Sequence, residues 1–127
     1  MDLTIVLFAL IGPFLVWPVE YFLPYPFIVE ELFKAILVFL FPQKSYKPIL
    51  LSGIPFAITE TALYSFNIIN YGSIGLFFTR LFLTSTLHSV TFLTIYLFNK
   101  KDKRLIVIGL TISILIHYLY NRYIPIY

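Results

Sequence analysis

The chain contains no cysteine among its 127 residues, and this absence removes several kinds of chemistry at once. Disulfides, thiolate metal ligands and cysteine catalysis are all excluded. Several familiar motifs are missing as well: the HExxH zinc helix, the GxSxG nucleophile turn, paired intramembrane aspartates and a glycine-rich phosphate loop. The function therefore has to be inferred from the hydrophobic pattern and from the few ionisable residues.

Charge is also scarce. Only 12% of the residues are charged and 60% are hydrophobic, whereas a soluble domain is about half apolar and about a quarter charged. Because such a chain cannot cover its surface with polar groups in water, we predict an integral membrane protein with a single domain over residues 1–127. The basic part of its +3 net charge lies mainly in two short loops, which suits contact with a lipid bilayer and does not suit nucleic-acid binding.

Polar and proline-containing breaks divide the chain into five apolar segments, at residues 3–22, 27–41, 48–69, 74–98 and 105–123. A bilayer core takes about 20 helical residues, so the second segment is short for a span. We expect it to enter the membrane through an elbow at residues 23–26, with Pro26 just ahead of its first turn. The pattern predicts an all-α, polytopic membrane helix bundle with about five transmembrane helices.

Two basic loops predict the orientation of these spans. Lys44 and Lys47 follow the second segment, and four further basic residues lie at positions 100–104. With five spans both loops fall on one side, which the positive-inside rule makes cytoplasmic. We therefore expect the amino end inside and the carboxyl end outside, in the plasma membrane, with Glu20 in the first outer loop.

The apolar segments also contain ionisable side chains. Each such residue costs about 2.5–3.5 kcal/mol on insertion scales and marks a functional site by default. At about 1.5 Å per helical residue, four segments bring carboxylates or imidazoles to a similar depth, between the midplane and the outer face. We expect one buried polar site, which contains Glu30, Glu31, Glu60, His88 and His117.

Each of these residues also has a simpler interpretation. Glu30 and Lys34 share a helix face at i and i+4 and could form a neutralising pair. Glu60 could bond a neighbouring helix, either histidine could be a packing residue, and Arg80 could snorkel or pair with a carboxylate. The serines and threonines around His88 more often satisfy backbone and helix contacts. The occurrence of all these ionisable residues in one chain nevertheless favours a functional site over separate structural roles.

Several functions are compatible with such a site. Peptide hydrolysis inside a membrane needs a water activated by a general base or a metal, and a donor for the oxyanion. A glutamate can be the base, two adjacent carboxyls cannot both ionise cheaply, and imidazoles with a carboxylate can hold Zn²⁺. The same residues could line the proton or cation pathway of a transporter, although the repeat typical of transporters is absent. A non-catalytic scaffold or immunity protein is the third alternative.

Four motifs in order resemble a known family. "EELFK" fits EExxK, "FAITE" fits FxxxE, a mid-helix histidine follows, and "HYLYN" fits the last motif. Over roughly residues 29–121 this order is similar to the PrsW family of intramembrane proteases, which is related to the CAAX-prenyl-protease and bacteriocin-processing group. Lys34 and Glu60 favour the PrsW branch, whereas Thr61 stands where that family has asparagine, and the chain is shorter than most PrsW proteins.

The resemblance implies roles for the site residues. Glu30 and Glu31 are the catalytic pair, and Glu31 is the favoured base. Either Zn²⁺ is held by His88, His117 and Glu60, or these residues hold water and stabilise the oxyanion without a metal. Lys34 balances charge and Asn121 is a supporting donor. The implied substrates are membrane-anchored proteins, such as an anti-sigma factor cut near its membrane span.

The topology generates the first test. Reporter tags fused to the two ends of the chain should lie on opposite sides of the membrane, with the amino end inside, because five crossings separate them. Protease protection or compartment-specific labelling of the tags measures this. Both tags in one compartment would show that the chain does not cross the membrane five times, and would contradict the common depth of the polar residues.

Overall fold

The computed structural model describes residues 3–70 and 74–124, with the side chains of residues 66–70 left out. Every regular element in these ranges is a helix: α1 (Thr4–Phe22), α2 (Pro26–Leu40), α3 (Lys47–Asn70), α4 (Ile74–Lys101), η1 (Lys103–Leu105) and α5 (Ile106–Tyr123). The prediction of an all-α bundle is confirmed. The predicted single domain also includes residues 1–2, 71–73 and 125–127, which lie outside the described residues.

Local sequence explains where the helices begin and end. The elbow between α1 and α2 forms as expected: Leu23 takes an extended backbone, with φ −112° and ψ 138°, and ends α1. Pro26 then occupies the first turn of α2, where its missing N–H leaves no hydrogen bond unmade. At the other end of the bundle, the Asp102 carboxylate accepts a hydrogen bond from the Arg104 backbone N–H at 2.8 Å and caps η1.

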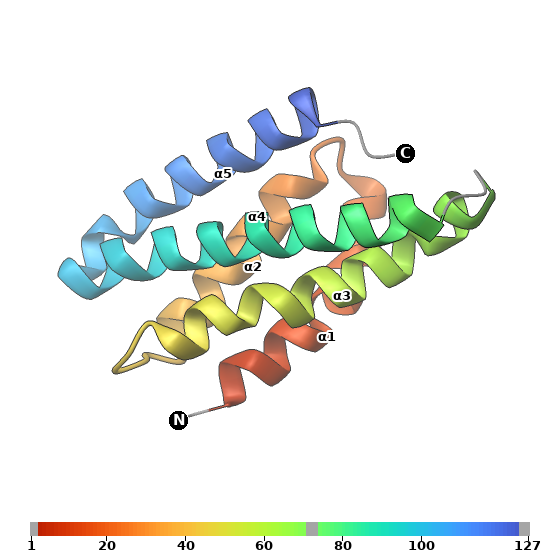
Figure 1. Ribbon diagram of the computed structural model, residues 1–127. Helices are drawn as coiled ribbons and strands as arrows, with labels where there is room; N and C mark the ends of the chain where they lie inside the picture. Colours follow the sequence, from red (N-terminus) through yellow and green to blue (C-terminus); the bar gives the residue numbers. More distant parts are fainter. Residues whose placement is uncertain (1–2, 71–73, 125–127) are drawn as a thin grey trace.

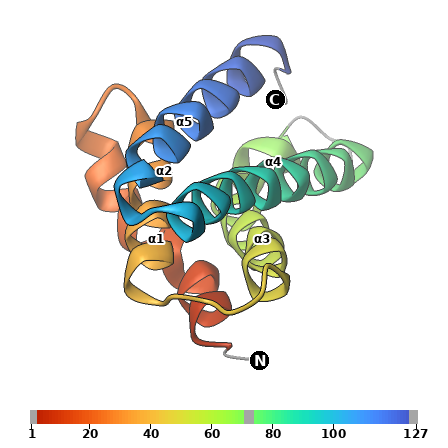
Figure 2. The same cartoon turned by 90° about the vertical axis from the view of Figure 1, so that its left-hand side faces the viewer.

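The short helix α2 lies among the other helices. It packs against α1, α4 and α5, while α3 packs against α1 and α4 (Figures 1 and 2). Apolar side chains fill the spaces between these helices, and the core includes Ile5, Ala9, Leu37, Val38, Ile49, Phe56, Phe92 and Ile95. Because α2 is covered on several sides, its polar residues are buried inside the bundle rather than exposed on its surface.

Among the described residues, three helical segments are long and apolar enough to cross a membrane: Thr4–Phe22, Ile74–Lys101 and Lys103–Tyr123. The start of α1, the α2–α3 connection and the α4–α5 junction lie at one end of the bundle (Figure 1). Two contacts join the loops there: Tyr96 donates to the Gln43 carbonyl at 3.2 Å, and Lys103 Nζ lies 6.0 Å from the Phe39 ring centre. The two basic loops therefore share one end of the molecule.

Helices α3 and α4 approach each other closely at Gly53. A Cβ atom on this residue would lie 2.2 Å from the backbone nitrogen of Ser89. The Ser89 hydroxyl also donates to the Leu50 carbonyl at 2.9 Å, so the two helices are joined at this point. Small residues allow such backbone contacts in membrane bundles, where interhelical packing replaces the hydrophobic effect.

This contact generates a test of the bundle. Gly53→Ala should lower the free energy of unfolding by about 1–3 kcal/mol, the usual cost of overpacking, because the new methyl group meets backbone that cannot move aside. Denaturation in detergent micelles measures the change. As a control, Gly75→Ala at an exposed position near the start of α4 should be neutral or slightly stabilising, because alanine favours helix. Equal stabilities for the two variants would contradict the tight crossing.

Candidate functional site

The polar site is built around the ammonium group of Lys34 on α2, whose side chain is fully buried. Its Nζ donates to Glu31 Oε1 at 2.6 Å, to His88 Nδ1 at 2.7 Å and to Thr91 Oγ1 at 2.8 Å. An ammonium group has three donors and no acceptor, so all of its protons are used. One lysine therefore joins α2 to two successive turns of α4.

Two aromatic rings lie beside this ammonium group. Lys34 Nζ is 5.1 Å from the Phe56 ring centre and 5.6 Å from that of Phe92, within the range of a cation–π interaction. The rings also exclude water from the cation. A buried charge is tolerated only when it is paired and hydrogen-bonded, and Lys34 meets that condition through its contact with Glu31.

From Lys34, one arm of the cluster leads through His88 to α3. The Nε2 atom of His88 is hydrogen-bonded to Glu60 Oε2. The other Glu60 oxygen lies 3.5 Å from Arg80 Nη2, and the Arg80 guanidinium lies 4.8 Å from the Tyr64 ring centre. Of the two alternatives expected for Arg80, pairing with a site carboxylate is therefore confirmed. We call His88, Glu60 and Arg80 the Glu60 arm.

The other arm leads through Glu31 to α5. Glu31 Oε1 is hydrogen-bonded to His117 Nδ1 at 2.8 Å as well as to Lys34. On the far side of the ring, His117 Nε2 lies 3.8 Å from Glu30 Oε2, which is too far for a direct hydrogen bond. We call Glu31, His117 and Glu30 the acidic arm.

The acidic arm ends in polar atoms that the described residues leave unpaired. Glu30 Oε2 and Glu31 Oε2 are both buried and have no hydrogen-bond partner in the described part of the chain. A buried acceptor without a partner costs about 1–3 kcal/mol, so buried groups of this kind usually bind a water or a ligand. The acidic arm is thus a place where the site can hold a small polar molecule.

The five residues expected to form the site come together from four helices. Glu30 and Glu31 lie on α2, Glu60 on α3, His88 on α4 and His117 on α5, and all five are buried. The two imidazole ring centres are 5.6 Å apart. The tertiary fold therefore brings these side chains to one place between the helices.

Other details differ from the expectations. The Glu30–Lys34 pair that the sequence left as an alternative does not form among the described residues, because Lys34 bonds Glu31 one residue further along. The i, i+3 spacing lets Glu31 reach Lys34, and Glu30 points toward His117 instead. Asn121, the expected supporting donor, is exposed on the last turn of α5. Its neighbour Tyr120 is the residue that contacts α4, through Thr84.

Glu20 does not lie in a loop. It belongs to α1, near the end of that helix, and is half-buried. Because α1 continues to Phe22, Glu20 lies in the last turn of the helix and not in the connection that follows it.

The sequence interpretation missed the role of Thr91. It grouped this residue with the serines and threonines that bond their own helix, and Thr91 does donate to the His88 carbonyl, as Thr86 and Thr94 donate to carbonyls four residues back. Thr91 is also fully buried and accepts a hydrogen bond from Lys34, a contact that the sequence interpretation did not include. Its position three residues after His88, on the same helix face, was the signal that could have identified it.

Three residues of the site bring possible metal ligands close together. Ligand atoms of Glu30, His88 and His117 lie within 4.8 Å of one another, so Glu30 takes the place that the sequence suggested for Glu60. A catalytic zinc ion takes three protein ligands. Both ring nitrogens of His88 are already hydrogen-bonded, to Lys34 and to Glu60. His88 thus has no free lone pair for a metal, and the remaining two residues do not make a zinc site.

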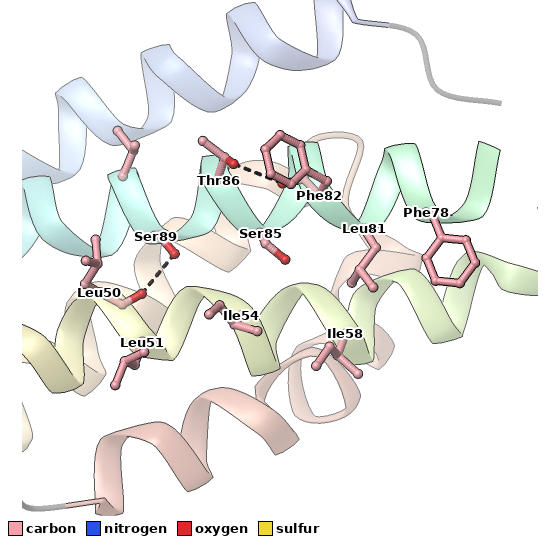
Figure 3. Close-up of a pocket in the computed structure, with 11 residues that line it drawn as sticks. Leu50, Leu51, Ile54, Ile58, Phe78, Leu81, Phe82, Ser85, Thr86 and Ser89 are labelled. Atoms are coloured by element: carbon pink, nitrogen blue, oxygen red, sulfur yellow. Dashed lines mark hydrogen bonds between the residues drawn. The ribbon is translucent and has the colours of Figure 1, made fainter. Parts of the chain in front are cut away.

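A separate apolar groove of about 660 Å³ lies between α3 and α4 (Figure 3). The Ser89–Leu50 and Thr86–Phe82 hydrogen bonds use the polar atoms of four of its residues. The polar cluster contributes no residue to its lining, which comprises Leu50, Leu51, Ile54, Ile58, Phe78, Leu81, Phe82, Ser85, Thr86, Ser89 and Val90. The groove is therefore distinct from the candidate site.

Together these features define an all-α bundle with helices able to cross a membrane and a buried cluster of carboxylates, imidazoles and one lysine. Comparisons with models of known protein families, with curated proteins and with solved structures found no match.

The contacts of Lys34 generate a stability test. Lys34→Met keeps much of the side-chain volume but removes the ion-pair partner of Glu31 and the donor to His88 Nδ1. Breaking a buried ion pair by removing one partner costs about 3–5 kcal/mol, so the free energy of unfolding in detergent should fall by that order. The control is Lys44→Met in an exposed loop, which should leave stability unchanged. A Lys34→Met protein as stable as the control would show that the ammonium group does not hold the cluster together.

Proposed function

We propose that this protein is an intramembrane endopeptidase that hydrolyses peptide bonds of membrane-anchored proteins near or within the bilayer. The observation that carries the proposal is the acidic arm, where two adjacent buried glutamates each keep an oxygen without a hydrogen-bond partner among the described residues, and His117 lies next to both glutamates. Hydrolysis needs a bound water and a group that takes its proton. The resemblance of the four motifs to PrsW proteases supports the same reaction.

Glu31 is the general base in this mechanism. Its Oε1 atom accepts hydrogen bonds from Lys34 and His117, which hold the carboxylate in place. Its Oε2 atom has no protein partner in the described residues and is available to take a proton from water. The hydroxide so formed attacks the scissile carbonyl carbon, and the proton on Glu31 then passes to the leaving amine as the C–N bond breaks.

Glu30 stabilises the intermediate. Two adjacent carboxyls buried from water cannot both ionise cheaply, so Glu30 keeps a proton while Glu31, paired with Lys34, is ionised. A neutral carboxyl is a hydrogen-bond donor and can donate to the oxyanion that forms on the attacked carbonyl. The Glu60 arm does not need to touch the substrate, because its contact with Lys34 through His88 positions the base.

The proposal includes a membrane orientation. The three apolar helices cross the bilayer together with α3, and the short α2 enters from the outer side and carries the glutamate pair within the bundle. The end with the two basic loops faces the cytoplasm by the positive-inside rule. The protein would then lie in the plasma membrane with its site open toward the outer half of the bilayer.

A proton transporter is the second candidate, and a continuous chain of ionisable groups favours it. Hydrogen bonds or ion pairs connect Arg80, Glu60, His88, Lys34, Glu31 and His117 in that order. The ammonium group in the middle argues against transport. Lys34 donates to both of its neighbours in the chain and can receive a proton only after it has given one up, which would leave the buried Glu31 carboxylate without its paired charge.

The glutamate pair separates the two functions. Glu31→Gln keeps the size and much of the hydrogen bonding but removes the base, so cleavage of a model transmembrane substrate in liposomes should fall by about 10²–10⁴-fold. Glu30→Gln keeps a neutral donor at the oxyanion and should reduce turnover less than Glu31→Gln does. As a matched control, Asp102→Asn exchanges an exposed carboxylate for an amide and should cleave at the normal rate.

The same liposomes serve for a measurement of proton flux. Full cleavage by both glutamine variants would rule out the glutamate mechanism. Proton flux in the normal protein, lost in the same variants and accompanied by no peptide product, would replace the protease proposal by the transporter.

A further inference from the structure

The two histidines of the chain lie in different hydrogen-bonding surroundings. Both rings are buried, with 0% exposure for His88 and 4% for His117. A neutral imidazole carries one N–H donor and one bare nitrogen that accepts. Which nitrogen carries the proton is set by the partner that the other nitrogen meets, so the neighbours of each ring determine its tautomer.

The neighbours of His88 require the proton on Nε2. Its Nδ1 atom meets the Lys34 ammonium at 2.7 Å, and because an ammonium group only donates, Nδ1 must be the bare acceptor. Nε2 therefore carries the proton and donates it to the Glu60 carboxylate. Thr91 is consistent with a fully protonated lysine: its hydroxyl donates to the His88 carbonyl at 3.2 Å and is thereby free to accept from Lys34.

The neighbours of His117 require the opposite tautomer. Its Nδ1 atom meets Glu31 Oε1 at 2.8 Å. That carboxylate oxygen already accepts a hydrogen bond from Lys34 and has no proton to donate, so Nδ1 of His117 must be the donor. The proton lies on Nδ1, and Nε2 is left with a bare lone pair that faces Glu30 Oε2 at 3.8 Å.

We propose that Lys34 is a positioning residue that sets opposite tautomers in the two histidines, and that the bare Nε2 of His117 binds the attacking water. Water has two protons. In the proposed reaction Glu31 takes one of them, and the other stays on the oxygen and is held by His117 Nε2. The oxygen lone pair that attacks is thereby aimed at the substrate. The water-binding part and the bare Nε2 of His117, which needs a neutral Glu30, rest on the proposed function, whereas the protons on His88 Nε2 and His117 Nδ1 follow from the contacts alone.

The tautomers are measurable on the full chain in detergent micelles. Protein labelled with ¹⁵N at histidine gives only two ring systems, and His88→Asn and His117→Asn assign them. Long-range ¹H–¹⁵N correlation should show two neutral rings, with the proton on Nε2 of His88 and on Nδ1 of His117. The same tautomer in both rings, rapid exchange between tautomers, or a doubly protonated ring would overturn the proposal. This spectrum decides the question even if variants of Lys34 do not fold.

The role of Lys34 is tested by replacing it. Lys34→Met removes the donor to His88 Nδ1, so the His88 ring should change to a mixture of tautomers, while Lys34→Arg keeps a donor and should retain Nε2–H. Lys44→Met is the control and should give the normal spectrum. An unchanged His88 tautomer in folded Lys34→Met would show that another contact sets it.

Cleavage assays distinguish this inference from the proposed function. His117→Gln lacks the water-binding nitrogen, and its kcat should fall with little change in KM. Opposite tautomers in a protein that cleaves nothing would remove the protease and the water-binding role and leave the tautomer assignment standing. Cleavage by the normal protein with both rings in the same tautomer would support the protease and remove the tautomer assignment. Normal kcat in His117→Gln would remove the water-binding role alone.

Discussion

The structure depends on one buried ammonium group that makes three hydrogen bonds. Lys34 contacts Glu31 on its own helix and His88 and Thr91 on α4, and through Glu31 it is connected to His117 on α5. Each of these polar groups would be costly inside an apolar bundle if it stood alone. Joined by Lys34, they satisfy one another. The same contacts that make burial of the cluster tolerable also give each group a defined donor or acceptor role.

The two arms of the cluster differ in how completely they are satisfied. In the Glu60 arm each carboxylate oxygen has a partner, from His88 or from Arg80. In the acidic arm Glu30 Oε2 and Glu31 Oε2 are buried without one among the described residues. Unpaired buried acceptors are typical of a place where a water or a ligand binds. In the protease that we propose, this asymmetry makes the Glu60 arm the support and the acidic arm the reactive part of the site.

Much of the architecture was predictable because it follows from local rules. The five apolar segments and their polar breaks correspond to the five α-helices, and the Pro26 elbow separates α1 from α2 as expected. Errors arose where spacing along one helix was used to assign partners. Glu30 and Lys34 share a face by the i, i+4 rule, yet Lys34 bonds Glu31, because His117 and the α4 residues complete the surroundings of each side chain.

By itself, the sequence determined the helical class, the approximate helix ends and the set of ionisable residues placed in apolar segments, because periodicity, composition and the cost of membrane charges are local properties. Only the tertiary structure decided which nitrogen of each histidine meets a donor and which meets an acceptor. It also decided that Thr91 belongs to the cluster, that Asn121 faces outward and that both nitrogens of His88 are occupied. These outcomes depend on how α2, α4 and α5 are rotated against one another. The spacing of residues within a single helix does not determine that rotation.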